Sequence, residues 1–211
     1  MKSIESIYNS ILLENQNPNN IDIELLKRCT DGTYNINDDG SIDVNGDVNL
    51  RYRPLTKIPF KFRNVSGGFD CTGNQLTSLE GAPKTVGGGF DCTGNQLTSL
   101  EGAPNRVSGG VYCDNNQLTS LEGAPKTVGG SFYCQNNQLT SLEGAPNSVG
   151  GNFSCYNNPN LPYSELFKIV DRVKGNIYYS SGRTREDKDK IRRDRDVKTV
   201  LKDDELGSLD V

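Results

Sequence analysis

The chain has 211 residues, 23 of them Lys or Arg and 27 Asp or Glu, with a formal net charge of -4 at pH 7. It lacks the basic footprint of a nucleic-acid binder, so we expect no nucleic-acid partner. No run of about 18 apolar residues is present, so we expect no transmembrane helix and no membrane partner. Histidine, the commonest general base, is absent, and we expect no enzymatic activity, no metal site and no cofactor.

Residues 1–40 predict an N-terminal helical cap or docking segment. Over 3–15 apolar side chains recur at helical spacing, which indicates an amphipathic helix capped by Ser3. A second short helix is expected over 23–28, and polar turns rich in Asp, Asn and Gly follow it. The apolar stripe of the first helix either covers the next domain or docks on another protein. It consists of Ile4, Ile7, Tyr8, Ile11 and Leu12.

The string NQLTSLEGAP occurs four times, and each copy begins 21 residues after the previous one. A fixed period of about 20 to 50 residues is typical of a stacked solenoid. The copies begin at Asn74, Asn95, Asn116 and Asn137. Since an uncovered solenoid end needs a cap, we favour the cap interpretation of the first helix over the docking one.

Each repeat predicts a short strand, an Asn turn, an extended stretch and a turn back. The Phe-x-Cys segment alternates apolar and polar residues, as a strand with one buried face does. The Gly-Gly before it suits a crowded turn, and the Pro of LEGAP keeps the return stretch extended. Parallel strands of successive coils should therefore stack about 4.8 Å apart. The sequence predicts a mainly β fold, a solenoid of short parallel coils over 41–180.

Both ends of the array depart from the repeat. A degenerate first unit places Val48, Leu50, Leu55, Ile58 and Val65 at core positions, so the array begins near Ser41. At the other end Ser164 is expected to cap a helix that covers the last coil, and a final strand is expected around Ile177 and Tyr179. The apolar residues of this capping helix are Leu166, Phe167, Ile169, Val170 and Val173.

Five cysteines share one repeat position and allow three interpretations: a metal array, a disulfide ladder or core filler. No C-x-x-C spacing occurs, which argues against a metal site. Parallel-strand side chains point the same way, which argues against disulfides. We therefore expect reduced, buried cysteines and a reducing compartment during folding. They are Cys71, Cys92, Cys113, Cys134 and Cys155.

Two further ranks of polar residues are interpreted as structural. The Asn that opens each NQL segment can bond backbone groups of its own and neighbouring turns. The Glu of each LEGAP segment forms a like-charge rank, which favours a solvated face over a cation site. This rank contains Glu80, Glu101, Glu122 and Glu143.

The residue before each cysteine and the residue after it vary from coil to coil. If Phe and Cys point inward, these positions lie on an exposed sheet face that changes from acidic to tyrosine-bearing along the array. Tyrosine is enriched at binding hot spots, although exposed strands also favour aromatic residues. We predict that this variable face binds another protein. Its candidate residues are Asp70, Asp91, Tyr112, Asp114, Tyr133, Gln135 and Tyr156.

Residues 181–211 form a charged tail with few core-forming side chains. We expect an exposed helix with ion pairs such as Glu186–Lys190 and Asp189–Arg193. Alone, this tail should be mobile.

The pattern V-x-x-x-F-x-C-x-x-N-x-L-x-x-L-x-x-A-P-x-x-V, over roughly 41–180, resembles a short leucine-rich repeat. Its second half is similar to the compact repeats of bacterial effector proteins. The LEGAP form is similar to repeat proteins of large tailed phages and gut bacteria. The resemblance implies a non-catalytic protein-binding module, either a virion-associated phage protein or an intracellular effector or anti-defence protein that binds a host protein. It also implies synthesis in the reducing host cytoplasm, followed by assembly into a virion in the first case.

Overall fold

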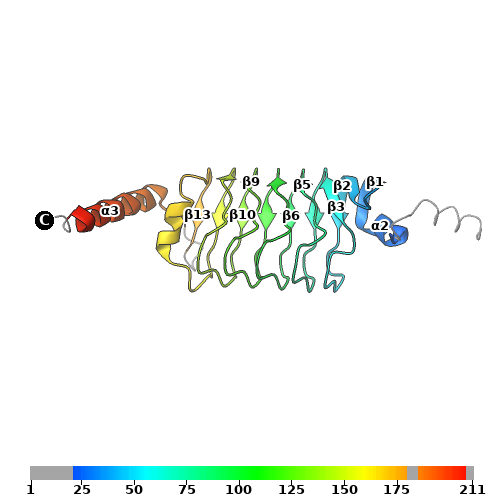
Figure 1. Ribbon diagram of the computed structural model, residues 1–211, viewed down its shortest axis with the longest axis horizontal. Helices are drawn as coiled ribbons and strands as arrows, with labels where there is room; N and C mark the ends of the chain where they lie inside the picture. The colour runs from blue at the N-terminus through cyan, green and yellow to red at the C-terminus, as the bar shows by residue number, and fades with distance from the viewer. Residues whose placement is uncertain (1–20, 180–184, 208–211) are drawn as a thin grey trace, which may run out of the picture.

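The computed structural model describes residues 21–179 and 185–207. It is an elongated parallel β-solenoid in which successive coils stack side by side, with a hairpin at one end and a long helix leaving the other (Figure 1). The mainly β solenoid expected over 41–180 is confirmed as far as residue 179. The helix expected over 3–15 lies outside the described residues. Within the described part, no helix is long and apolar enough to cross a membrane.

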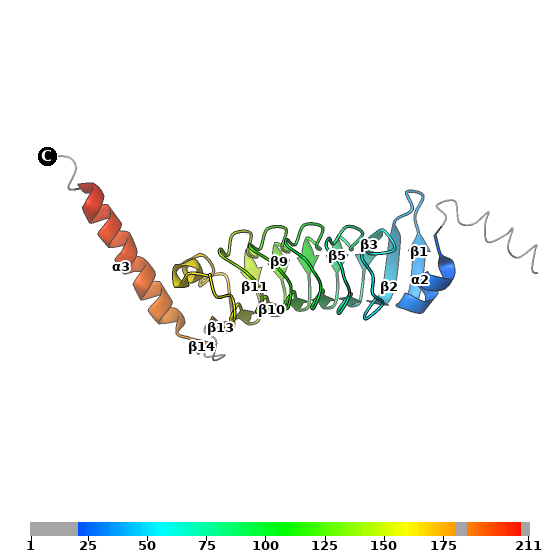
Figure 2. The same cartoon turned by 90° about the horizontal axis from the view of Figure 1, so that it is seen from below.

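The N-terminal cap consists of a helix and a β-hairpin. The helix α2 (Ile23–Cys29) confirms the short helix expected over 23–28. The polar turns expected after it are wrong, because β1 (Thr30–Ile36) pairs antiparallel with β2 (Ile42–Asn49). The polar composition of β1 concealed this strand, since its pairing with β2 rather than its own pattern stabilises it. The hairpin covers the open edge of the first coil (Figure 2).

Two stacks of short parallel strands form the walls of the solenoid. Both start from β2, because its first residues pair with β3 and its last residues with β4. In every later coil a Gly-Gly corner separates the two strands. One stack continues through β3 (Phe62–Val65), β5 (Thr85–Val86), β7 (Arg106–Val107), β9 (Thr127–Val128) and β11 (Ser148–Val149). The other continues through β4 (Phe69–Asp70), β6 (Phe90–Asp91), β8 (Val111–Tyr112), β10 (Phe132–Tyr133), β12 (Phe153–Ser154) and β13 (Ile177–Tyr178).

The corners need glycine because successive coils approach closely there. A Cβ atom on Gly109 would lie 2.7 Å from the backbone of Gly88 in the preceding coil. Real side chains do not tolerate such a distance, so this position is glycine in each of these coils: Gly67, Gly88, Gly109, Gly130 and Gly151.

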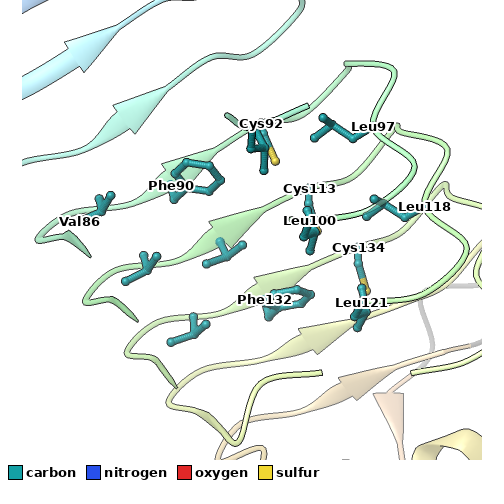
Figure 3. Packing of buried hydrophobic residues seen from close by; sticks show 14 of the residues in the cluster. Val86, Phe90, Cys92, Leu97, Leu100, Cys113, Leu118, Leu121, Phe132 and Cys134 are labelled. Carbon is teal, nitrogen blue, oxygen red and sulfur yellow. The ribbon is translucent and has the colours of Figure 1, made fainter. Parts of the chain in front are cut away.

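The core is a set of ladders made from equivalent residues of successive coils (Figure 3). The parallel register pairs Phe69 with Phe90, and their rings stack with centroids 5.7 Å apart. Identical side chains therefore fill identical spaces, which explains why a chain with only 33% hydrophobic residues forms a continuous core. In the degenerate first unit, Leu55 is partly buried and the other four expected core residues are buried.

The buried Asn rank is structural, as expected. The Asn116 amide donates to the carbonyl oxygen of Cys113 at 3.2 Å and to that of Cys92, one coil earlier, at 3.1 Å. Its Oδ1 accepts the Leu97 N–H at 3.1 Å. One side chain thus satisfies backbone groups of two coils that the strands leave unpaired. The same pattern recurs at Asn74, Asn95, Asn137 and Asn158.

The C-terminal cap is shorter than expected and begins differently. It is a 3-10 helix, η1 (Tyr163–Lys168), with Pro162 at the N-cap position and no side-chain cap, so the capping role expected for Ser164 is wrong. Proline has a fixed φ and starts the turn before Ser164 is reached. The covering role is confirmed: Leu166, Ile169, Val170 and Val173 are buried and Phe167 is partly buried.

The charged tail adds a strand and a helix. The strand β14 (Arg185–Glu186) pairs antiparallel with β13, and α3 (Lys188–Gly207) then leaves the solenoid (Figure 2). The first turns of α3 are attached to the body, because Ile191 is buried and Asp171 bonds Arg192 and Arg195. The expected helix is confirmed. Its described ion pairs have other partners than expected and include Lys190–Asp194, Arg192–Asp189 and Arg193–Asp187.

Candidate protein-binding face

The parallel register aligns the candidate residues along one side of the solenoid. Asp70 pairs with Asp91, Asp91 with Tyr112, and Tyr112 with Tyr133. Because one residue per coil occupies each place, neighbouring side chains of this rank lie one strand spacing apart, about 4.8 Å. We call the surface formed by the seven candidate residues the variable face. Whether it binds a protein stays a prediction.

The acidic side chains at the N-terminal end of the variable face have a local structural role. Oδ1 of Asp70 accepts the Thr72 N–H at 3.0 Å, and Oδ1 of Asp91 accepts the Thr93 N–H at 2.9 Å. These are Asx turns, which bring each strand to its end. In the sequence, the Asp-x-Thr spacing is the signal for these turns. A shallow hollow of about 340 Å³ lies here, lined among others by Asp70, Asp91 and Tyr112.

Asp114 is a partly buried acid of the variable face. The Thr93 hydroxyl donates to its Oδ1 at 3.1 Å, and the Asn115 amide donates to its Oδ2 at 2.6 Å. Burial raises the pKa of the Asp114 carboxyl above its usual range, although these hydrogen bonds act in the opposite direction. The face therefore holds one partly desolvated negative charge next to its tyrosines.

Tyr112 and Tyr133 form a ridge across the variable face. Their rings stack with centroids 5.2 Å apart and planes 16° apart. Tyr112 is 38% exposed, so the ridge is open to solvent. The stacked pair is an amphipathic group held by few rotatable bonds, which suits a contact surface.

A second hollow lies beyond the ridge, at the point where the tyrosine rank is interrupted. The next residue after Tyr133 in the register is Ser154, which is 2% exposed, and the one after that is Tyr178. This Ser154 hollow has a volume of about 290 Å³. Its lining residues are Tyr133, Gln135, Asn152, Ser154, Tyr156 and Tyr178.

Sequence reasoning missed Tyr178 and Asn152 in this hollow. The strict period of 21 residues places Gly175 after Ser154, whereas the register pairs Ser154 with Tyr178. The turn that contains η1 lengthens this coil, so counting along the repeat fails here. The signal available in the sequence was the Ile-Tyr pair of β13, which repeats the Phe-Tyr pair of β10.

A larger hollow of about 530 Å³ lies over the other stack, beside the hairpin. Its polar side chains already bond one another: the Asn64 amide donates to Asp43, and the Thr85 hydroxyl donates to the Asn64 oxygen at 2.7 Å. Arg63 also pairs with Asp43. A ligand would have to break this network, so this hollow is the weaker candidate for a site.

The cysteine ladder is buried and reduced. All five cysteines of the rank are free, as expected of core filler, and Cys29 is also free and buried. Burial raises the pKa of the thiols of Cys71, Cys92, Cys113 and Cys134. A neutral buried thiol is a poor nucleophile and a poor metal ligand. Across residues 21–179 and 185–207, no group of three or more His, Cys, Asp or Glu side chains is placed to hold a metal ion.

The fold and the face together define the class: this chain is a parallel β-solenoid with a constant core and a variable strand face. The sequence matches no protein-family model, and comparisons with curated proteins and with solved structures give no match. The assignment to a repeat architecture therefore rests on the 21-residue period and on the strand register.

Proposed function

We propose that this chain is a non-catalytic protein-binding module whose variable face contacts the partner. The observation that carries the proposal is the contrast between the two sides of each β-strand in the second stack. Inward-facing residues of the strands stay large and apolar from coil to coil, Phe with Val111 in one coil, whereas the outward-facing residues change from acids to the exposed Tyr112–Tyr133 ridge. Packing requires the repeated residues, and specific recognition requires positions that differ.

The proposal is tested by replacing Tyr112, Tyr133 and Tyr156 together with Ser in the full chain. The readout is the amount of the protein partner that co-purifies with the chain from its native source. We expect at least a tenfold loss, because tyrosines at an interface centre commonly contribute about 2 kcal/mol or more each. If the amount of co-purifying partner is unchanged, the variable face is not the contact surface.

The matched control replaces three exposed polar residues on the loops that follow the strands, at equivalent positions of three coils. This variant carries Gln96→Ser, Gln117→Ser and Gln138→Ser. It should keep the partner at the original level and unfold at the same urea concentration as the tyrosine variant. A shift in unfolding for the tyrosine variant alone would attribute its loss of partner to damage in the fold.

Within this proposal, the LEGAP repeats favour a structural protein of a phage particle, and the similarity to effector repeats supports the alternative of an effector or anti-defence protein. The two differ in where the chain occurs. A virion protein is present in purified particles at a fixed number of copies, whereas an effector is found free in infected cells bound to a host protein.

A further inference from the structure

We infer that Tyr52 is a second anchor for the protein partner, separate from the Tyr112–Tyr133 ridge. The inference rests on the proposed function and extends the contact surface from the variable face to the first coil. It names a partner that lies along the solenoid axis and makes an apolar contact at each of two points. Three observations carry it: the exposure of Tyr52, its backbone conformation and its position.

The first observation is where the chain exposes large hydrophobic side chains. Among the residues whose exposure the structure describes, these are Tyr112, at 38%, and Tyr52, at 74%. A single exposed apolar residue is common on a protein surface and needs no explanation. Here, however, both exposed residues are tyrosines of the second strand stack, and one of them already belongs to the ridge. The described surface therefore keeps large apolar side chains away from solvent except at two places on one wall.

Tyr52 also has a backbone conformation that its side chain does not favour. Its φ is 51°, in the left-handed region, which a bulky residue rarely adopts. The equivalent residues of the later coils are Gly or Asn, which adopt this region readily. Because most of Tyr52 is exposed, core packing does not require its ring either. Strained residues that packing does not require are characteristic of functional sites.

The position of Tyr52 connects it to the variable face. Its N–H donates to the Thr72 carbonyl oxygen at 3.0 Å, and one coil later the Gly73 N–H donates to that of Thr93 at 2.9 Å, so both continue the ladder of the second stack. The ring leans toward the later coils, since a Cβ on Gly73 would lie 2.3 Å from its Cε1 atom. Three strand spacings, about 14 Å, separate the coils of Tyr52 and Tyr112.

These positions fit one protein partner. A typical interface covers about 800 Å² on each protein, which is about 30 Å across, so both tyrosines lie within one footprint. The hollow of about 340 Å³ lies between them, because its lining contains Tyr112 and Arg51, the neighbour of Tyr52 in the chain. A partner that spans this hollow contacts a tyrosine at each end, and tyrosines are frequent hot spots of interfaces.

The first experiment separates a contact role of Tyr52 from a structural one. In the full chain, Tyr52→Asn removes the ring and supplies a residue that suits the backbone, whereas Tyr52→Phe keeps the ring. We expect Tyr52→Asn to reduce the co-purifying partner at least about fivefold and Tyr52→Phe to keep about half of it or more. The urea midpoint of unfolding should not fall in either variant. Gln75→Ser, at an exposed position one coil later, is the matched control and should keep the partner.

The second experiment identifies what covers this position. The chain contains no tryptophan, so Tyr52→Trp introduces a single indole whose fluorescence reports its exposure to solvent. We expect acrylamide to quench this indole in the free chain as it quenches an exposed one, at every protein concentration. In the purified complex with the partner, quenching should fall at least about threefold, because an interface excludes solvent from its anchors.

Several results would overturn the inference. One is an unchanged amount of partner with Tyr52→Asn, and another is an equal loss with Tyr52→Phe, because the ring is then not the contact. A lower urea midpoint for Tyr52→Asn would attribute its loss of partner to damage in the fold. Weak quenching in the free chain would show that this chain covers Tyr52 itself, and quenching that weakens as the protein concentration rises would show a second copy there.

The two proposals can fail separately. If Tyr52→Asn keeps the partner while the triple tyrosine variant loses it, the proposed function stands and only the second anchor is wrong. If both variants keep the partner, the proposed function fails as well.

Discussion

Among single residues, one repeat position changes from Tyr in the first coil to Gly in the next two and to Asn in the last three. Its six residues all have positive φ, between 51° and 66°, which Gly and Asn adopt most readily. In the last three coils the Asn side chains bond one another: Asn136 donates to Asn115 at 3.1 Å, and Asn157 donates to Asn136 at 2.8 Å. The full rank is Tyr52, Gly73, Gly94, Asn115, Asn136 and Asn157.

This rank predicts opposite effects for the same substitution in two coils. A Cβ on Gly94 would meet only ordinary contacts at 3.8 Å, so Gly94→Asn should extend the amide ladder and raise the free energy of unfolding by about 0.5–1 kcal/mol. A Cβ on Gly73 would lie 2.3 Å from the Tyr52 ring, so Gly73→Asn should lower stability. Urea unfolding of both variants checks this. Equal effects of the two substitutions on the free energy of unfolding would show that contact with the Tyr52 ring does not destabilise the Gly73 variant.

The buried thiols predict a loss of stability in alkali. Their folded-state pKa values are raised by burial, whereas in the unfolded chain a thiol ionises near pH 8.5. Their contribution is therefore complete below about pH 8.5 and is lost as pH rises from there toward the folded-state pKa. Above the unfolded pKa each thiol lowers the free energy of unfolding by about 1.4 kcal/mol per pH unit.

The measurement is urea unfolding between pH 7.5 and pH 9.5 under reducing conditions. A Cys113→Ala variant, which lacks one thiol, should lose stability less steeply over this range, although it is less stable at neutral pH. A slope that is the same for the variant and the full chain would contradict this origin of the pH dependence.

At the scale of elements, the terminal hairpin shows how tertiary pairing overrides local composition. Gly32 faces Gly46 across β1 and β2, and a Cβ on Gly46 would lie 1.6 Å from the Asp31 carbonyl oxygen. The two glycines let polar strands with weak strand preference pack against the first coil. Within 30–36 only Tyr34, Asn35 and Ile36 alternate as a half-buried strand does, and Asp31-Gly32 is a turn signal, which explains why the sequence predicted turns there.

We expect Gly46→Ala to detach β1 from β2. The added methyl group forces the two backbones apart, so hydrogen exchange of the β1 amides should accelerate by about a hundredfold or more, while the later coils keep their protection. The neighbouring substitution Asn45→Ala, at an exposed position of the same strand, is the control. If β1 exchanges at the same rate in both variants, the glycine pair is not what holds the hairpin in place.

At the scale of the whole molecule, the coils form a one-dimensional array in which each coil contacts its neighbours. Removal of one complete period should therefore preserve the fold. Deletion of 74–94 joins Gly73 to Asn95 in register. We expect cooperative urea unfolding with a free energy lower by about 1–3 kcal/mol and a solenoid shorter by about 4.8 Å in small-angle scattering.

The control deletion removes 74–84, about half a period. It places strand residues opposite turn residues and core residues toward solvent, so we expect loss of cooperative unfolding. If both deletion variants unfold with the same cooperativity, the pairing register between coils does not determine the stability of the solenoid.

The repeating parts of this protein could be predicted from its amino-acid sequence. The period specified the coils, and the identity of equivalent residues specified the Phe, Cys and Leu ladders and the Asn bonds, because each coil in a parallel stack meets a copy of itself. It also placed the seven candidate residues on one face, since strand alternation and a constant offset suffice for that.

The arrangement at the places where the period breaks could not be predicted in this way. The hairpin depends on pairing between polar strands, the start of η1 on Pro162, and the place of Tyr178 on a coil lengthened by that turn. The Ser154 hollow follows from this last change, because it brings a tyrosine to the far side of a small residue. These features depend on contacts between neighbouring coils that differ from each other. A repeated sequence pattern predicts such contacts only where neighbouring coils are alike.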